Sequence, residues 1–518
     1  MTSPHDPAPA GPAPEPDPER PGGGGRTLRE RIGRVAAASA AAVVFGQLVS
    51  LVQTVALARL LSPTEVGWFA AGSVLTAFAS NVVEGGLRAG LVQREDRLDD
   101  AAETVFRATI VSGFLTMLLA LGIAPLVALV FDSRTAGLVA ASMAGGVFLF
   151  AFTNVPEALL QREFSVRRRL VVGPAVAVSF AVVSVTLAAL GLGVWSMVIG
   201  SYASTLTWVA TLWWICDWRP GRGRASLPMY RELVHFGFPL ALGLFAEQTE
   251  KGVQAGVTGH VLGASGLGLF RYGERIAQIP VGALVEVSSV ALFPAFSRIA
   301  DDADRFRQSY LRALGLVVTA AAGVTALLVA IGEPLVVLVL GEQWRGAGVV
   351  LVAMAGLGLG KAFTTVSEEA IKGAGRTSLL NWYTLTEFTL TIALLLALVG
   401  PLGLVGVGLS VSVTALLVGL TVMTLARPVV GVRWRDLAAT TLPAIVAAAG
   451  AGDVTHLLET ELLRAETHSV LLGLALLALA GLVMLTSYVV LLRVLAPRAY
   501  RAASDVALTV LRRLRPRP

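Results

Sequence analysis

The chain has 518 residues, of which 55% are hydrophobic and only 15% are charged. A soluble protein carries about a quarter charged residues, so this composition excludes an ordinary soluble enzyme and indicates a protein whose solvent is the lipid bilayer. The net charge of +6 does not indicate nucleic-acid binding, because most of the basic residues are arginines that flank hydrophobic segments.

The segment before the first hydrophobic stretch, residues 1–30, is rich in Pro, Ala and Gly. It cannot bury a core, so we expect a disordered cytoplasmic tail. The hydrophobic stretch that follows is longer than the apolar region of a signal peptide, and no convincing cleavage site comes after it. We therefore expect this stretch to be the first transmembrane helix.

Long apolar stretches recur along the chain, and each can cross a hydrocarbon core of about 30 Å as a helix. Hydropathy and loop composition predict fourteen such helices, and no segment between them could form a soluble catalytic domain. The predicted fold class is therefore an all-α polytopic membrane protein. The predicted spans are 35–61, 66–92, 104–131, 136–160, 169–191, 194–216, 233–262, 267–297, 306–331, 346–372, 378–400, 403–426, 435–453 and 469–493.

Basic residues are distributed unevenly over the loops between these spans. If the N-terminus is cytoplasmic, the outer loops hold only Arg59, Arg134, Arg345 and Arg464, and the other loop arginines lie inside. This positive-inside pattern requires an even number of spans and places both termini in the cytoplasm. The basic segment 496–518 is amphipathic, and we expect it to lie on the inner surface of the membrane lipids, with a solvated tail as the alternative.

The chain contains a weak internal repeat. LLSPTEVGWF (Leu60–Phe69) parallels VLGASGLGLF (Val261–Phe270) at an offset of 201, and PLVALVF from Pro125 parallels PLVVLVL from Pro334 at an offset of 209. Further matches follow in the same order. Six spans in each half predict two parallel, pseudo-symmetric bundles, residues 31–218 and 219–430, with the transported molecule between them. Residues 431–495 are then two appended helices.

Four stretches carry a resemblance to a known family: ARLLSPTEVGWFAAGSVLTAFASNVVEGGLRAGLVQRED, PEALLQREFSVRRR, LFPAFSRIADDADRFRQSYLRAL and EPLVVLVLGEQW. Over residues 30–430 the sequence resembles the polysaccharide transporter family, the Wzx-type oligosaccharide flippases of the multidrug/oligosaccharidyl-lipid/polysaccharide (MOP) superfamily. Where such proteins carry Asn and Asp in the seventh span, this sequence reads Glu247, Gln248, Thr249, Glu250 and Lys251.

The resemblance implies a flippase in the bacterial cytoplasmic membrane that moves an undecaprenyl-pyrophosphate-linked oligosaccharide outward by alternating access between two six-helix lobes. It also implies work beside a glycan polymerase and other polysaccharide-assembly proteins, and a coupling cation, H+ or Na+, as a further partner.

Several charged residues fall within the predicted spans, where each must face protein, water or ligand because a charge at the bilayer centre costs about 2.5–3.5 kcal/mol. We expect one set to bind the pyrophosphate and glycan: Lys251, Arg271, Arg275 and Lys361. A second set balances charge or binds the coupling ion: Glu247, Glu250, Glu274, Glu368, Glu84 and Arg88. The alternative is that these residues only pair with one another, as Glu247 with Lys251, Glu274 with Arg271 or Arg275, and Glu84 with Arg88.

Other chemistry has little support in the sequence. There is no GxxxxGK[ST] phosphate-binding loop, no HExxH pattern and a single cysteine, Cys216, so we expect no catalytic residue, no cofactor and no metal site. Two related functions stay open, an ion-coupled multidrug exporter and a peptidoglycan-precursor flippase of the same superfamily. A membrane glycosyltransferase or glycan ligase is the more distant alternative.

Overall fold

The computed structural model describes residues 24–163, 165–380, 383–497, 499–502 and 504–505, and every regular element within these ranges is helical. The main helices are α1 (Gly24–Leu60), α2 (Pro63–Glu84), α3 (Leu87–Gln93), α4 (Leu98–Val130), α5 (Arg134–Ala151), α6 (Asn154–Arg162), α7 (Gly173–Ala189), α8 (Val194–Ile215), α9 (Leu227–Ser297), α10 (Ala303–Leu340), α11 (Arg345–Ala353), α12 (Gly356–Gly373), α13 (Tyr383–Val430), α14 (Trp434–Leu457) and α15 (Val470–Leu495). Short π or 3-10 turns join some of them: η1 (Arg168–Val172), η2 (Glu342–Trp344), η3 (Thr377–Leu380), η4 (Leu458–Leu463) and η5 (Ala465–Thr467).

The chain is a multi-pass membrane protein, and the predicted all-helical polytopic fold is confirmed. Within the described part, eleven helical stretches are long and apolar enough to cross a membrane. Two of these, in α9 and α13, each contain a sharp kink, at Gly263 (φ 71°) and Gly403 (φ 56°), where glycine adopts a backbone conformation that other residues rarely reach. Dividing both at the kink and adding α8 would give fourteen spans, and this number stays a prediction.

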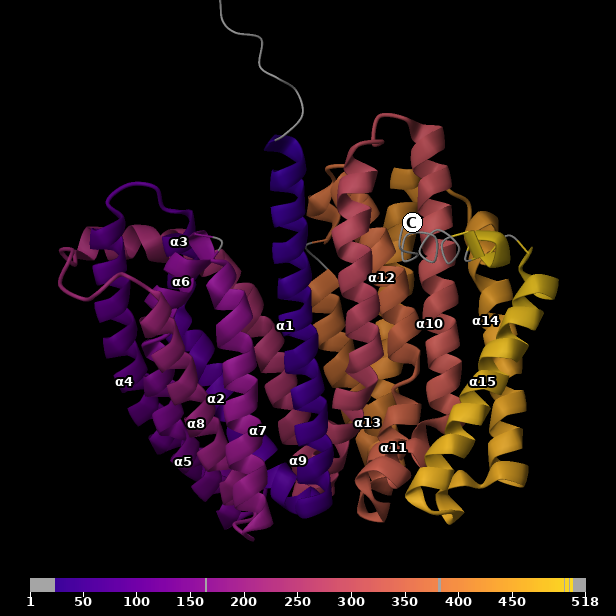
Figure 1. Ribbon diagram of the computed structural model, residues 1–518, viewed down its shortest axis with the longest axis horizontal. Helices are drawn as coiled ribbons and strands as arrows, with labels where there is room; N and C mark the ends of the chain where they lie inside the picture. The colour runs from indigo at the N-terminus through magenta and orange to yellow at the C-terminus, as the bar shows by residue number, and fades with distance from the viewer. Residues whose placement is uncertain (1–23, 164, 381–382, 498, 503, 506–518) are drawn as a thin grey trace, which may run out of the picture.

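The helices lie side by side, with α2 to α8 on one side, α10 to α13 on the other, and α1 and α9 between them (Figure 1). The helices α14 and α15 stand at the outer edge beside α10. We refer to the end of the bundle where α1 finishes as the Leu60 end and to the opposite end, where α9 finishes, as the Ser297 end. The division into lobes at 31–218 and 219–430 stays a prediction.

At the Leu60 end, α2 is in backbone contact with the kinked part of α9. A Cβ atom on Gly67 of α2 would lie 1.8 Å from the carbonyl oxygen of Ala264, and one on Gly268 of α9 would lie 1.9 Å from that of Pro63. Only glycine permits this approach. The largest buried cluster continues from this contact and includes residues of α1, α2, α9, α10 and α12. The molecule is therefore closed at the Leu60 end.

At the Ser297 end, the start of α9 lies against the N-terminal helices. Its Leu233 belongs to the same buried cluster as Leu91 of α3. The loop from α8 to α9 is bound to α4, because the backbone N–H of Gly221 donates to Glu103 at 2.7 Å and that of Arg224 donates to Asp100 at 2.7 Å. The loop is therefore fixed to the N-terminal helices.

Some predicted spans are interrupted in the structure. The second, 66–92, divides into α2 and α3 because Gly85 and Gly86 adopt left-handed conformations (φ 49° and 74°). The fourth and the tenth are also interrupted, into α5 and α6 at residues 152–153 and into α11 and α12 at residues 354–355, where the backbone keeps a right-handed conformation. The first helix begins at Gly24, within the segment expected to be a tail. Much of the segment 496–518 lies outside the described residues.

Candidate functional site

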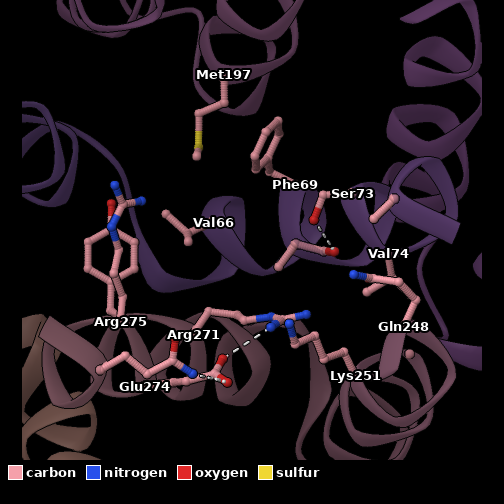
Figure 2. A pocket seen from close by; sticks show the side chains of 15 residues that line it. Val66, Phe69, Ser73, Val74, Met197, Gln248, Lys251, Arg271, Glu274 and Arg275 are labelled. Atoms are coloured by element: carbon pink, nitrogen blue, oxygen red, sulfur yellow. Dashed lines mark hydrogen bonds and ion pairs between the residues drawn. The ribbon is translucent and has the colours of Figure 1, made fainter. Parts of the chain in front are cut away.

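A cavity of about 510 Å³ opens between α2 and α9, with Met197 of α8 above it (Figure 2). One wall consists of apolar and small residues of α2, and the opposite wall consists of polar and charged residues of α9. We call it the cationic cavity. Its lining residues from α2 are Val66, Phe69, Ala70, Ser73, Val74 and Ala77, and those from α9 are Gln248, Lys251, Gly252, Arg271, Tyr272, Glu274, Arg275 and Gln278.

The charged residues of this cavity are only partly neutralised. Arg271 forms an ion pair with Glu274 at 3.1 Å, and the amide of Gln278 donates to the same carboxylate at 3.1 Å. Arg275 donates instead to the hydroxyl of Ser50 on α1, at 2.6 Å, and forms no ion pair with a described carboxylate. The prediction left open whether Glu274 would pair with Arg271 or Arg275, and the structure selects Arg271.

The basic residues lie near the middle of the bundle in depth. Lys251 comes twelve residues before the kink at Gly263, and Arg275 comes twelve residues after it. With a helical rise of about 1.5 Å per residue, both residues lie about 18 Å from the Leu60 end, close to half of a bilayer core. The kink therefore brings two cations from distant parts of one helix to the same depth.

A second cavity, of about 590 Å³, lies between α9, α12 and α13. It shares Lys251, Glu274 and Gln278 with the cationic cavity, so the two spaces adjoin along α9. Four carboxylates and two lysines line it, which gives a formal excess of two negative charges. We call it the acidic cavity; its charged residues are Glu247, Glu250, Lys251, Glu274, Lys361 and Glu387.

Both lysines of the acidic cavity form ion pairs. Lys251 is 2.7 Å from Glu247, one helical turn away on the same face, and both side chains are about half exposed. Lys361 of α12 is 2.9 Å from Glu387 of α13. Each ammonium group is therefore held by one carboxylate in this conformation. Another anion that entered the cavity would compete with that carboxylate for the lysine.

The remaining predicted site residues lie elsewhere. Glu84 pairs with Arg88 at 3.0 Å, and Glu368 pairs with Lys372 at 2.7 Å, both near the Ser297 end. None of these four residues lines either cavity. Contacts with neighbouring residues thus account for Glu84, Arg88 and Glu368 in this conformation, while Lys251, Arg271, Arg275, Glu274, Lys361, Glu247 and Glu250 lie around the two cavities.

The sequence prediction did not include Glu387, Gln278 or Tyr272. Glu387 is the partner of Lys361, and it could have been found as the one carboxylate within the predicted span 378–400. Tyr272 stacks on Trp344, with ring centroids 4.2 Å apart, and forms part of the wall of the cationic cavity. No pattern in the sequence distinguishes this tyrosine from an ordinary buried aromatic residue.

The basic side chains that line the two cavities are suited to binding anions. Guanidinium groups present several N–H donors in a planar fork that matches phosphate oxygens, and a cavity within the membrane strengthens such contacts. Within the described residues, no group of three His, Cys, Asp or Glu side chains could hold a metal ion. The fold and these cavities define the class of the protein: a polytopic helical membrane transporter.

Comparison with known proteins identifies the family. The model of a family described as "Polysaccharide biosynthesis protein" matches residues 56–348, more than half of the chain. The chain therefore belongs to the polysaccharide biosynthesis protein family, and the resemblance seen in the sequence is confirmed.

Curated relatives have names that agree with this family. The succinoglycan biosynthesis transport protein ExoT of Rhizobium meliloti (strain 1021) is 27% identical over 346 residues, which cover 65% of this chain and 68% of ExoT. The lipopolysaccharide biosynthesis protein WzxC of Escherichia coli (strain K12) is 22% identical over 353 residues, 64% of this chain and 68% of WzxC.

A solved structure shares the fold. The lipid II flippase MurJ in an inward closed conformation superimposes with a TM-score of 0.71, at 14% identity, over 88% of this chain and 98% of MurJ. At this level of identity the similarity shows the fold alone.

Proposed function

We propose that this protein translocates a lipid-linked oligosaccharide, of the undecaprenyl-pyrophosphate type, across the bacterial cytoplasmic membrane for polysaccharide biosynthesis. Translocation proceeds by alternating access between two lobes, residues 31–218 and 219–430. The family and the names of its relatives support polysaccharide transport.

The observation that carries the proposal is the charge of the cationic cavity. Lys251 is paired with Glu247 and Arg271 with Glu274, so the guanidinium of Arg275 leaves a formal excess of one positive charge near the middle of the membrane. A pyrophosphate diester is an anion whose oxygens match these donors. The same excess would repel a cationic drug, which favours the oligosaccharide carrier over the multidrug exporter.

The direction of transport follows from membrane orientation. We place the Ser297 end in the cytoplasm, with both termini, because the arginine-rich loops belong to that end. The Leu60 end, which is closed in this conformation, then faces outward. An inside-negative potential contributes about 2.3 kcal/mol per charge and per 100 mV toward outward movement of an anion.

The acidic cavity suits the coupling cation. Glu250 and Glu387 face it together with Lys361, so a proton or Na+ that neutralises a carboxylate there would weaken an ion pair next to the cargo site. Because Glu274 and Lys251 belong to both cavities, a change of charge in one alters the field in the other. This connection is the physical basis that we propose for coupling.

A flipping assay tests the proposal. Wild-type protein in vesicles should move an undecaprenyl-pyrophosphate oligosaccharide, and Arg275→Gln should lower the rate about 10- to 100-fold, since one charge-assisted contact contributes about 1.5–3 kcal/mol. The matched control is Arg305→Gln, which removes an arginine whose side chain is 74% exposed and which lies outside both cavities.

Two outcomes would contradict the proposal. Equal rates for wild type and Arg275→Gln would show that the cationic cavity does not bind the headgroup. Faster movement of a peptidoglycan precursor than of the oligosaccharide lipid would favour the peptidoglycan-precursor alternative.

A further inference from the structure

At the Leu60 end, Arg59 of α1 caps the C-terminus of α10, and the turn η2 that follows α10 caps the C-terminus of α1. The guanidinium of Arg59, on the last turn of α1, donates to the backbone carbonyls of Val339, at 2.9 Å, and of Leu338, on the last turn of α10. In return, the indole N–H of Trp344 donates to the carbonyl of Ala58 at 2.7 Å. The amide of Gln343 donates to the same carbonyl at 3.0 Å and to that of Leu61 at 3.3 Å.

These hydrogen bonds satisfy the backbone carbonyl groups at the C-terminal ends of the two helices. The last carbonyls of an α-helix have no partner within the helix, and the C-terminus carries partial negative charge. Two such ends would repel each other at close range, and the cation of Arg59 lies between them. We call Arg59, Gln343 and Trp344 the outer lock. It joins α1, which packs on α7, to α10 and η2 on the opposite side.

The outer lock is continuous with the cationic cavity. Trp344 is fully buried and stacks on Tyr272, which lines that cavity. The hydroxyl of Tyr272 also approaches the carbonyl of Thr54 on α1, at 3.5 Å. Movement of η2 would therefore reach the wall of the cargo site.

The appended helices contact this lock through one arginine. Arg345, the residue after Trp344, forms ion pairs with Glu333 at 2.8 Å and with Glu342 at 2.7 Å. It also pairs with Glu466, at 3.0 Å, in the turn η5 that joins α14 to α15. The connection between α14 and α15 is thus bound to the turn that carries Gln343 and Trp344.

A packing contact adds a second link. The side chain of Leu338 is buried in one cluster with Ala465 of η5 and Leu477 of α15. A Cβ on Gly473 of α15 would lie 2.8 Å from that leucine side chain and 2.6 Å from the carbonyl of Ala465. The last turn of α10 therefore binds Arg59 through its backbone carbonyls and packs against α15 through the side chain of Leu338.

From these contacts we propose a function for α14 and α15: they hold η2 and the end of α10 in the position that receives α1, and so stabilise the state closed at the Leu60 end. The proposal rests on the alternating access of the proposed function. Opening at this end must break the contacts of the outer lock. The ion pair of Glu466 with Arg345 is the means by which the appended helices make these contacts harder to break.

The test measures opening directly. Spin labels at Arg134→Cys and Leu402→Cys, two exposed positions at the Leu60 end, report the separation of the two sides in vesicles, in a Cys216→Ser background. We expect mostly short separations. Arg59→Met should raise the ratio of long to short separations about tenfold or more, because two hydrogen bonds to a cation are lost.

Glu466→Gln should raise the same ratio about threefold or more. Its matched control, Glu461→Gln in the same hairpin, removes an exposed carboxylate with no described partner and should change the ratio less than about twofold. If α14 and α15 act through the outer lock, the double variant Arg59→Met/Glu466→Gln should raise the ratio of long to short separations by less than the product of the two single increases. Circular dichroism verifies that each variant keeps its helices.

Three results would overturn the proposal: no effect of Arg59→Met, no difference between Glu466→Gln and Glu461→Gln, or independent effects in the double variant. The separations require no cargo, whereas the flipping assay does. If wild type flips the oligosaccharide lipid but Glu466→Gln leaves the separations unchanged, the role of α14 and α15 is refuted and the proposed cargo is not. If Glu466→Gln alters the separations but wild type does not flip the oligosaccharide lipid, the proposed cargo is refuted and the role of α14 and α15 is not.

Discussion

Replacing Arg168 by methionine removes the partner of a deeply buried carboxylate. Both guanidinium contacts of Arg168, one of them at 2.8 Å, are made to a single oxygen of Glu157, and the other oxygen of Glu157 has no partner within the described residues. The side chain of Glu157 is 9% exposed and that of Arg168 is 26% exposed. The variant therefore leaves a carboxylate inside the N-terminal helices without a counter-charge.

The size of the effect follows from these exposures. Breaking a fully buried pair from one side costs about 3–5 kcal/mol, whereas an exposed pair contributes about 0–1 kcal/mol. The partial exposure of Arg168 lets water reach the site, so we expect a loss of about 2–3 kcal/mol. For a folding unit of about 150–250 residues, this corresponds to a midpoint lower by roughly 4–12 °C.

The chain contains its own reporter for this measurement. Cys216 is the only cysteine in the sequence, it is buried, and it belongs to the same hydrophobic cluster as Val155 and Leu159 of α6, the helix that carries Glu157. A thiol-reactive dye should therefore label it only when this part of the protein opens. Heating the detergent-solubilised protein with the dye gives the midpoint of opening.

Two variants make the experiment decisive. Arg167→Met removes the neighbouring arginine, which is exposed, and should lower the midpoint by less than about 2 °C. Arg168→Met/Glu157→Gln removes both charges and should recover much of the loss. If Arg168→Met behaves like Arg167→Met, or if the double variant is no more stable than Arg168→Met, the carboxylate is not the cause and the reasoning is wrong.

Three further predictions concern single positions. Gly67→Ala should shift the spin-label separations toward the open state or lower stability, since its Cβ would meet a backbone oxygen of α9, whereas Gly252→Ala, with its nearest atom at 3.4 Å, should do neither. Ser62→Ala removes the N-cap of α2 and should cost about 1 kcal/mol in thermal unfolding; no loss would argue against the capping box. Lys361→Met should lower the unfolding midpoint more than Lys361→Met/Glu387→Gln does, and the reverse order would show that the ion pair is not what stabilises the acidic cavity.

Much of the fold could be predicted from the sequence, because hydropathy and arginine placement follow from the bilayer itself. The last two predicted spans, 435–453 and 469–493, differ from α14 and α15 by only a few residues. The interruption of the second span was missed, although the Gly85-Gly86 pair is a common turn signal. What the sequence does not reveal is the close approach of α9, where the carbonyl oxygen of Gly237 would lie 2.2 Å from a Cβ on Gly86.

The candidate site could be predicted in its charges but not in its partners. Helical spacing suffices for Lys251 and Glu247, which are four residues apart. It does not reveal that Lys361 pairs with Glu387, because these residues are 26 positions apart in sequence and lie on different helices. Nor does it show that Arg275 faces Ser50, 225 residues away. Such contacts depend on how the helices are arranged, which local patterns do not encode.

The loop between α8 and α9 has a mechanical consequence. Because Gly221 and Arg224 are bound to α4, the loop that links the two proposed lobes is held to α4 at both of these residues. In the alternating access that we propose, the start of α9 therefore moves with α4, and the rocking of the lobes is absorbed inside α9. Pro239 lies within its first part, where the missing backbone hydrogen bond makes bending cheapest. In this mechanism α9 is the element that bends, so lengthening the loop between α8 and α9 would not make the movement of the lobes easier.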